Sequence, residues 1–280
     1  MLNKQQRASG KTIALHSYKG GTGKTTLIAN LASYYAKIGL SVCLLDFDLY
    51  APTLSLYFRK RPNVYLNDLL RGETKQRSEI DITDVLVDVS SELGLRGKLL
   101  LGFSSSGKED ISEIEIKHEQ KWQLAAIKRF LFAKNKLFDE YGLDYLFLDT
   151  SPGIRYWSIN SLATADLLFL IMKNSDMDIE GTKKMITDIY QELAKFGSKY
   201  FIILNKVPGA SPVDEVRWGV DEKAFESQLE KDIGTSIVGS IPCFCDIQFS
   251  KHEFLYAINQ PDHPFSKNLA TLAENIRRLG

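Results

Sequence analysis

Apolar runs and amphipathic segments alternate along most of this chain. The apolar runs are short, rich in Leu, Ile, Val and Phe, and bounded by polar or turn-forming residues, a pattern that predicts buried strands. The amphipathic segments are longer and place apolar residues three or four positions apart, which predicts helices. The predicted strands are residues 12–16, 41–45, 82–89, 99–103, 145–148, 167–172, 200–204 and 237–241, and the predicted helices are 25–38, 66–70, 119–141, 179–196 and 266–279.

The order of these elements predicts an α/β fold. Apolar strands separated by helices indicate a mostly parallel central sheet with helices on both faces, which gives three layers. The two least regular stretches, 71–79 and 104–117, are predicted to be surface loops, and neither has the character of a domain boundary. We therefore expect residues 1–280 to form a single domain in which residues 1–10 are flexible.

A glycine-rich segment joins the first predicted strand to the first predicted helix. The order strand, glycine-rich turn, lysine and helix is that of a P-loop, whose backbone N–H groups hold polyphosphate at a helix N-terminus. A mobile glycine-rich loop is the alternative, and the order of elements argues against it. Lys24 is placed to reach the β- and γ-phosphates and Thr25 to bind Mg²⁺. The candidate cradle is Gly20, Gly21, Thr22, Gly23, Lys24, Thr25 and Thr26.

Carboxylates follow two other predicted strands. Asp46 and Asp48 end the second strand, and in an open α/β sheet this edge faces the phosphate cradle. One of them is suited to a metal-bound water and the other to the attacking water, although a polar Asx-type turn would use the same residues. Asp149 follows four apolar residues, the Walker B form, and is the expected Mg²⁺ partner.

Two later strand ends suggest how a base is held. Asn205 offers both a donor and an acceptor, which suits a purine edge, but it could equally be a turn residue. No Asp stands two residues after Lys206, where a guanine-specific motif has one, so adenine is favoured. The loop that begins at Pro242 could close over the base or be an ordinary connection.

Composition limits the binding partners and the cellular location that the sequence supports. Lys and Arg balance Asp and Glu at 35 each, so global charge gives no case for nucleic acid or an anionic membrane. Three cysteines make no disulfide framework, no apolar run is long enough to span a bilayer, and the N-terminus lacks a signal-peptide pattern. A cytoplasmic location is expected. Cys243 and Cys245 are too closely spaced for the usual metal-binding pair.

The motifs together resemble the MinD/ParA/Mrp superfamily of deviant Walker A ATPases. The strict P-loop pattern is missed at Tyr18, and an extra lysine, Lys19, precedes the glycines, as in that superfamily. The order and spacing of the motifs match along most of the chain, and the division and chromosome-partitioning ATPases are the nearest likeness. The resemblance implies ATP and Mg²⁺ as cofactors and an ATP-dependent homodimer in which Lys19 reaches the partner's nucleotide. It implies that Asp48 positions the attacking water, and that Asp46 and Asp149 organise the metal.

The resemblance also implies where in the cell the protein acts, and it leaves an alternative function open. Its members act in spatial positioning, with a partner protein that stimulates the ATPase and with a nucleoid or membrane surface. The apolar stripe of residues 265–279 is expected to dock on the core, whereas division-type relatives carry a membrane-targeting helix there. The alternative is an Mrp-type iron–sulfur carrier, although Cys243 and Cys245 form C-x-C where that group has C-x-x-C. A synthetase acting on a small molecule is a third class, for which no substrate pocket is visible in the sequence.

Overall fold

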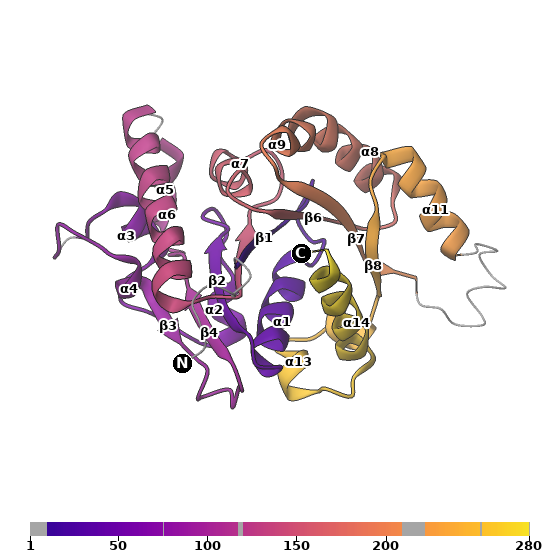
Figure 1. The fold of residues 1–280 in the computed structure, drawn as a ribbon, viewed down its shortest axis with the longest axis horizontal. Helices are drawn as coiled ribbons and strands as arrows, with labels where there is room; N and C mark the ends of the chain where they lie inside the picture. The colour runs from indigo at the N-terminus through magenta and orange to yellow at the C-terminus, as the bar shows by residue number, and fades with distance from the viewer. Residues whose placement is uncertain (1–9, 75, 117–119, 209–221, 253, 280) are drawn as a thin grey trace.

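The fold is built around one eight-stranded sheet (Figure 1). The computed structural model describes residues 10–74, 76–116, 120–208, 222–252 and 254–279. The strands run in the order β3-β4-β2-β5-β1-β6-β7-β8, and all neighbours are parallel except β3 and β4. Their bounds are β1 Lys11–His16, β2 Ser41–Phe47, β3 Leu86–Asp88, β4 Lys98–Gly102, β5 Tyr145–Thr150, β6 Leu167–Met172, β7 Lys199–Val207 and β8 Ile237–Pro242.

Helices cover both faces of this sheet, which confirms the predicted three-layer α/β fold. Side chains alternate across each strand, so Ile13 and Leu15 of β1 join one apolar core while Ala14 joins the other. One face packs on α1 Lys24–Lys37, α2 Leu54–Phe58, α13 Tyr256–Asn259 and α14 Pro264–Arg278. The other packs on α3 Leu66–Arg71, α4 Ile82–Val85, α6 Gln120–Tyr141, α7 Tyr156–Leu162, α8 Asp176–Met185, α9 Gln191–Lys195 and α11 Glu222–Ile233.

The last long helix, α14, lies on the core as expected. Its apolar stripe, which includes Phe265, Leu269 and Ile276, is buried against the same face of the sheet as α1. Tyr35 of α1 donates a hydrogen bond to the Ala273 carbonyl at 2.9 Å. The stripe therefore has a packing role in this chain. The one-domain prediction stays a prediction, and residues 1–9 lie outside the described part of the chain.

Two predictions of local structure were wrong. Residues 82–89 were expected to form one strand, but the chain forms α4 and then the short β3. Asp81 explains the difference, because its carboxylate accepts hydrogen bonds from the backbone N–H and the hydroxyl of Thr83 and caps a helical turn. The expected loop at 104–117 contains α5, Lys108–Ile116, which lacks a clear apolar face. Arg71 anchors α5 through Asp110 and Glu113.

The predicted helix 179–196 is also more complex than expected. It begins at Asp176, passes through a π-helical turn at Ile186–Tyr190 and continues as α9. The short helices α2, α7, α12 (Cys245–Gln248) and α13, as well as α11, were not predicted. Each short helix is only four to seven residues long, too short to show a clear helical repeat of apolar positions in the sequence.

Candidate functional site

The predicted site residues converge at the carboxyl ends of the parallel strands. Strand β5 lies between β1 and β2, and Asp46 of β2 stands directly opposite Asp149 of β5 in the sheet register. Strand β1 ends at His16, and the glycine-rich loop then crosses this edge to enter α1 at Lys24. The topology therefore brings the loop and both carboxylates together, as the sequence predicted.

The loop is shaped for a ligand that sits close to its backbone. Gly21 and Gly23 have φ of 77° and 90°, in the left-handed region that favours glycine. A Cβ at Gly23 would stand 2.4 Å from Nδ2 of Asn205, so no larger residue fits there without a shift. Gly23 is also the N-cap of α1, and it has no side chain to compete for the N–H groups of the first turn.

Lys24 is buried and points back into the loop. Its ammonium donates to Oγ of Ser17 at 2.9 Å, and that hydroxyl donates to the Lys19 carbonyl at 2.8 Å. Burial lowers the pKa of Lys24, while the nearby charges of Asp149 and Asp48 raise it and offset part of the effect. The cation is thus held at the floor of the cradle by a residue, Ser17, that the motif did not indicate.

Two buried carboxylates stand opposite each other at this edge of the sheet, and Asp149 is the one whose charge acts on Lys24. Asp149 is 1% exposed, and neither of its oxygens has a hydrogen-bond partner among the described residues. Burial raises its pKa to about 7, although Lys24 and then the Thr25 hydroxyl oppose that shift. The Thr25 hydroxyl lies near the carboxylate but falls short of hydrogen-bond geometry. Burial, followed by the charges of Asp149 and Asp48, raises the pKa of Asp46 well above its usual range.

These carboxylates form a donor set that fits a divalent cation. Magnesium prefers carboxylate, hydroxyl and water oxygens, and an orphaned buried carboxylate is stabilised when a cation binds it. Asp46 is already oriented, because it accepts hydrogen bonds from the backbone N–H groups of Asp48 at 3.1 Å and Leu54 at 3.3 Å. Thr25, Asp46 and Asp149 are therefore placed together as candidate metal residues.

Asp48 follows the second strand, and hydrogen bonds from its own loop and from the loop after β5 hold its carboxylate. Its Oδ1 accepts hydrogen bonds from the Ser151 hydroxyl at 2.6 Å and from the backbone N–H of Ala51 at 3.1 Å. The Ser151 loop is tied to the cradle in turn, because the N–H of Gly153 donates to the Ser17 carbonyl at 2.9 Å. The loops after β1, β2 and β5 are consequently linked in one hydrogen-bonded chain.

Lys19 lies at the outer rim of the cradle, and its surroundings differ from those of Lys24. Its ammonium forms an ion pair with Oδ1 of Asp178, in the first turn of α8, at 3.3 Å. The Lys19 side chain is 34% exposed and that of Asp178 is 2% exposed. In this structure Lys19 is therefore bound within its own chain.

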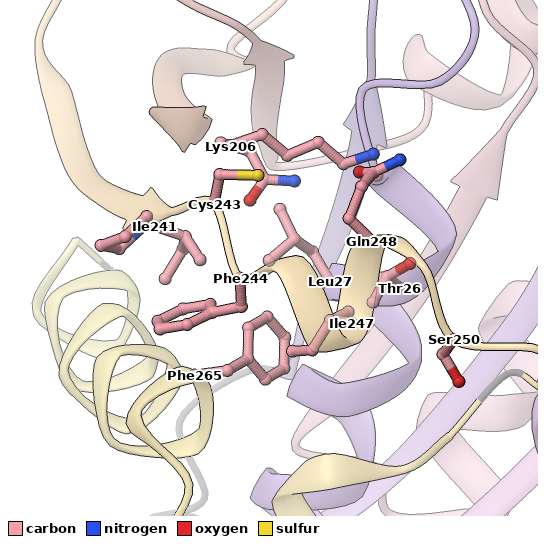
Figure 2. A pocket seen from close by; sticks show the side chains of 13 residues that line it. Thr26, Leu27, Lys206, Ile241, Cys243, Phe244, Ile247, Gln248, Ser250 and Phe265 are labelled. Carbon is pink, nitrogen blue, oxygen red and sulfur yellow. The ribbon is translucent and has the colours of Figure 1, made fainter. Parts of the chain in front are cut away.

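A cavity of about 200 Å³ opens beside the cradle. Asn205 and Pro242, the two residues predicted to hold a base, both line it, and Figure 2 shows Cys243, Phe244 and Phe265 around its wall. Asn205 donates through Nδ2 to the Thr22 carbonyl at 2.7 Å, which leaves its Oδ1 as an acceptor for an exocyclic amine. Thr26 also lines this cavity, and its hydroxyl shares a 2.8 Å hydrogen bond with that of Tyr57.

Sequence reasoning missed four residues that organise the site. Ser17, Ser151 and Asp178 contact Lys24, Asp48 and Lys19 respectively, and Lys206 donates to the Gly21 carbonyl at 3.2 Å. Lys206 has φ of 57°, and its position directly after Asn205 was a usable signal. The other three are ordinary residues in sequence and gain their roles only through the packing of separate loops.

Comparison with known proteins agrees with this geometry. Residues 13–247 match the model of the CobQ/CobB/MinD/ParA nucleotide binding domain. The chain belongs to this family. The match spans the glycine-rich loop, the three aspartates, and both Asn205 and Pro242, so the resemblance seen in the motifs is confirmed for the superfamily.

Curated relatives of the chain have several different roles. An iron–sulfur cluster carrier protein of Aquifex aeolicus is 25% identical over 95% of this chain and 67% of its own length. The chromosome-partitioning ATPase Soj of Treponema pallidum is 28% identical over 64% of both chains. The septum site-determining protein MinD of Thermotoga maritima is 23% identical over 97% of this chain and 89% of its own. Because these relatives have different roles, sequence similarity identifies the family of this chain but not its role within the family.

Solved structures confirm the fold. MinD of Pyrococcus furiosus superposes with a TM-score of 0.72 at 22% identity, covering 97% of this chain and all of that one. MinD of Pyrococcus horikoshii, solved as a complex with Mg-ADP, superposes with a TM-score of 0.70 at 20% identity, over 96% and 97% of the two chains. Within the part of this chain that the structure describes, no helix is long and apolar enough to cross a membrane.

The raised pKa of Asp149 predicts how the stability of the metal-free protein depends on pH. The folded state keeps the Asp149 proton up to about pH 7, its raised pKa, whereas the unfolded state loses the proton near 3.8, the ordinary pKa of an aspartate. The unfolding free energy should therefore fall as pH rises from about 4 to 7, by at most about 1.4 kcal/mol per pH unit for this one proton. Denaturant unfolding without metal or nucleotide measures it.

Two substitutions isolate this effect. In Asp149→Asn the carboxyl is gone, and its share of the pH slope should disappear. In Asp139→Asn, which changes an exposed acid on α6, the wild-type slope should remain. A constant difference in stability between wild type and Asp149→Asn from pH 5 to 7.5 would contradict the assignment.

Proposed function

We propose that this protein is a Mg²⁺-dependent ATPase switch, which dimerises when it binds ATP and acts in spatial positioning of the chromosome-partitioning or division-site type. One observation carries the proposal: the two lysines that bracket the glycines stand in different surroundings. Lys24 is buried and faces the cradle, while Lys19 stands at the rim and is one-third exposed. Two cations aimed at one nucleotide would share a setting, so this difference supports two separate roles.

The cradle supports ATP binding within the subunit. The amides of residues 20–26 and the Lys24 ammonium suit the charge of the phosphates, and Asn205 with Pro242 suits the adenine base. Thr25, Asp46 and Asp149 are the residues that would hold Mg²⁺. When bound, Mg²⁺ neutralises phosphate charge and lowers the barrier to phosphoryl transfer.

Asp48 is the candidate for orienting the attacking water. Its carboxylate lies on the loop after β2, where the Ser151 hydroxyl and the Ala51 N–H fix one of its oxygens. The second oxygen is left to accept a hydrogen bond from water. A positioned acceptor of this kind aligns water with the γ-phosphorus, and the leaving oxygen is that of ADP.

The surface around the cradle supports a second copy as the ATP-dependent partner. Large apolar side chains stand exposed in the segments that follow β1, β5 and β6, which include the Lys19 loop and the first turns of α7 and α8. Soluble proteins usually cover an exposed apolar cluster. An apolar rim around a nucleotide site fits closure of two subunits over their nucleotides. The exposed side chains are Tyr18, Ile154, Tyr156 and Met177.

The named relatives support a positioning role. Soj and MinD are named for chromosome partitioning and septum placement, and MinD of Aquifex aeolicus has been solved with MinC. We propose that this chain also has a partner protein, one that stimulates its ATPase, that the protein is cytoplasmic, and that it works on a nucleoid or membrane surface. The docked stripe of α14 is not free to serve as a membrane contact in this structure.

The first test removes the rim lysine. Lys19→Ala should bind ATP as the wild type does, because Lys24 and the loop amides remain, but should lose ATP-dependent dimerisation. Analytical ultracentrifugation with a non-hydrolysable ATP analogue measures the dimer. Lys184→Ala, which removes an exposed lysine from the nearby helix α8, is the matched control. A normal dimer in Lys19→Ala would defeat the proposal.

The second test concerns Asp48. Asp48→Ala should still bind ATP but turn it over at least tenfold more slowly, since the oriented acceptor is lost, and its dimer should persist longer than that of the wild type. Phosphate release and dimer lifetime are the two measurements. Turnover at the wild-type rate would remove Asp48 from the reaction.

A second candidate function is favoured by two exposed thiols. Cys243 and Cys245 are free and exposed, on the loop that leaves β8 beside the base cavity, and one relative is named as an iron–sulfur cluster carrier. Thiolates are the usual ligands of such clusters. No group of three or more His, Cys, Asp or Glu suited to a metal occurs among the described residues, so a carrier role needs ligands from a second copy or a partner.

Anaerobic reconstitution with iron and sulfide tests this candidate. A carrier should retain iron and show visible absorbance, and the Cys243→Ser/Cys245→Ser double variant should lose both. The Cys43→Ser variant is the control, because Cys43 is buried in the core. Protein that retains no iron would exclude the carrier role and leave the switch proposal intact.

A further inference from the structure

We propose that Asp178 is a positioning residue that holds Lys19 inside its own subunit and so opposes dimerisation until ATP is bound. This inference rests on the proposed function, because it assumes that Lys19 acts across the dimer interface. The observation behind it is the 3.3 Å ion pair between the Lys19 ammonium and Asp178 Oδ1. It joins a residue of the cradle to a helix more than 150 positions later in the chain.

The acceptor is built into the start of α8. Ser175 is the N-cap of this helix, and its hydroxyl accepts a hydrogen bond from the backbone N–H of Asp178 at 3.3 Å. The same hydroxyl contacts Asp178 Oδ2 at 3.0 Å. Oδ1 is then the oxygen that faces Lys19. A carboxylate fixed in this way presents one oxygen in one direction, which suits a specific ion pair better than a solvated surface contact.

The rim of the cradle is packed onto the same helix. A Cβ at Gly181 would stand 2.1 Å from the ring of Tyr18, so this ring lies directly on the backbone of α8. Tyr18 immediately precedes Lys19, and the packing therefore places the lysine stem next to Asp178. Two adjacent contacts, one apolar and one ionic, hold the rim of the loop against α8.

Lys19 cannot serve both partners at once. To reach a nucleotide in a second copy, its ammonium must leave Asp178, and this happens in both subunits of a symmetric dimer. If a fraction f of monomers has Lys19 released, the dimer association constant is scaled by f squared. A modest change in the ion pair therefore produces a large change in dimerisation.

The release is feasible because Asp178 does not depend on Lys19 alone. After Lys19 departs, the Ser175 hydroxyl and the positive end of α8 remain beside the carboxylate. The pair thus has the character of an exchangeable contact. By comparison, Lys24 lies near the buried carboxylate of Asp149 and donates to the buried hydroxyl of Ser17, so it is placed to stay where it is.

The experiment compares Asp178→Asn with Asp176→Asn, which removes an exposed charge from the same first turn of α8. Two quantities are measured on the full chain: the dissociation constant of the dimer formed with a non-hydrolysable ATP analogue, and the rate at which Lys19 is modified by an amine-specific reagent in the nucleotide-free monomer. Asp178→Asn should dimerise at least tenfold more tightly and should expose Lys19 to faster modification. Asp176→Asn should match the wild type in both.

The outcomes separate the two proposals. Unchanged Lys19 modification, or faster modification without tighter dimerisation, overturns the role of Asp178. If the wild type dimerises and the two variants do not differ from it, only this inference fails. If neither wild type nor Asp178→Asn dimerises with the analogue, the proposed function fails and this inference fails with it. Fluorescent-nucleotide affinity and the melting temperature report folding, and Asp178→Ser replaces the Asn variant if that one melts early.

Discussion

The site depends on bringing one buried cation and two buried carboxylates to the same edge of a parallel sheet. Lys24 enters at the start of α1, and Asp46 and Asp149 stand opposite each other on β2 and β5. None of these groups would be stable alone in a dry interior, because a buried unpaired charge costs several kcal/mol. Together, the lysine offsets part of the cost of burying the acids, and the raised pKa of Asp149 shows that the offset is incomplete. Because burial disfavours both carboxylate anions, a divalent cation that binds here would stabilise their charged forms and displace their protons, which makes this edge receptive to such an ion.

The same constraint fixes the loops that surround the site. Asp46 accepts hydrogen bonds from the backbone of the Asp48–Leu54 segment, and Asp48 accepts one from Ser151. The segment after Ser151 is tied back to the cradle through Gly153 and Ser17. A change of charge at the centre therefore acts on hydrogen bonds in three loops, and two of them, after β1 and β5, lead to Tyr18, Ile154 and Tyr156 of the proposed interface. In the proposed switch, these short contacts would connect the phosphate site to the surface where a second copy binds.

The sequence predicted the parts of the fold and site that are local. The apolar strands and the order strand–loop–helix are local patterns, so the sheet and the position of Lys24 followed from them. The segment 82–89 was assigned to one strand because its apolar residues alone were considered, while the capping carboxylate of Asp81 makes its first half helical. The helix α5 escaped prediction because ion pairs with Arg71 anchor it and no apolar face marks it. Ser17, Ser151 and Asp178 could not be found from sequence, since each contacts a site residue only after separate elements pack.

The two lysines of the cradle are chemically identical, but their different burial makes one ammonium group fixed and the other able to move. A departure of Lys24 is costly, because the buried Asp149 carboxylate would lose the positive charge that most offsets its burial. Lys19 lies at the surface, where water can solvate it as it moves, and its partner Asp178 keeps a helix terminus and a hydroxyl for support. The ion pair at the rim can therefore exchange while the charges at the floor stay fixed. A protein with this arrangement can keep its nucleotide site intact throughout a cycle and confine the change to the surface where a second copy would bind.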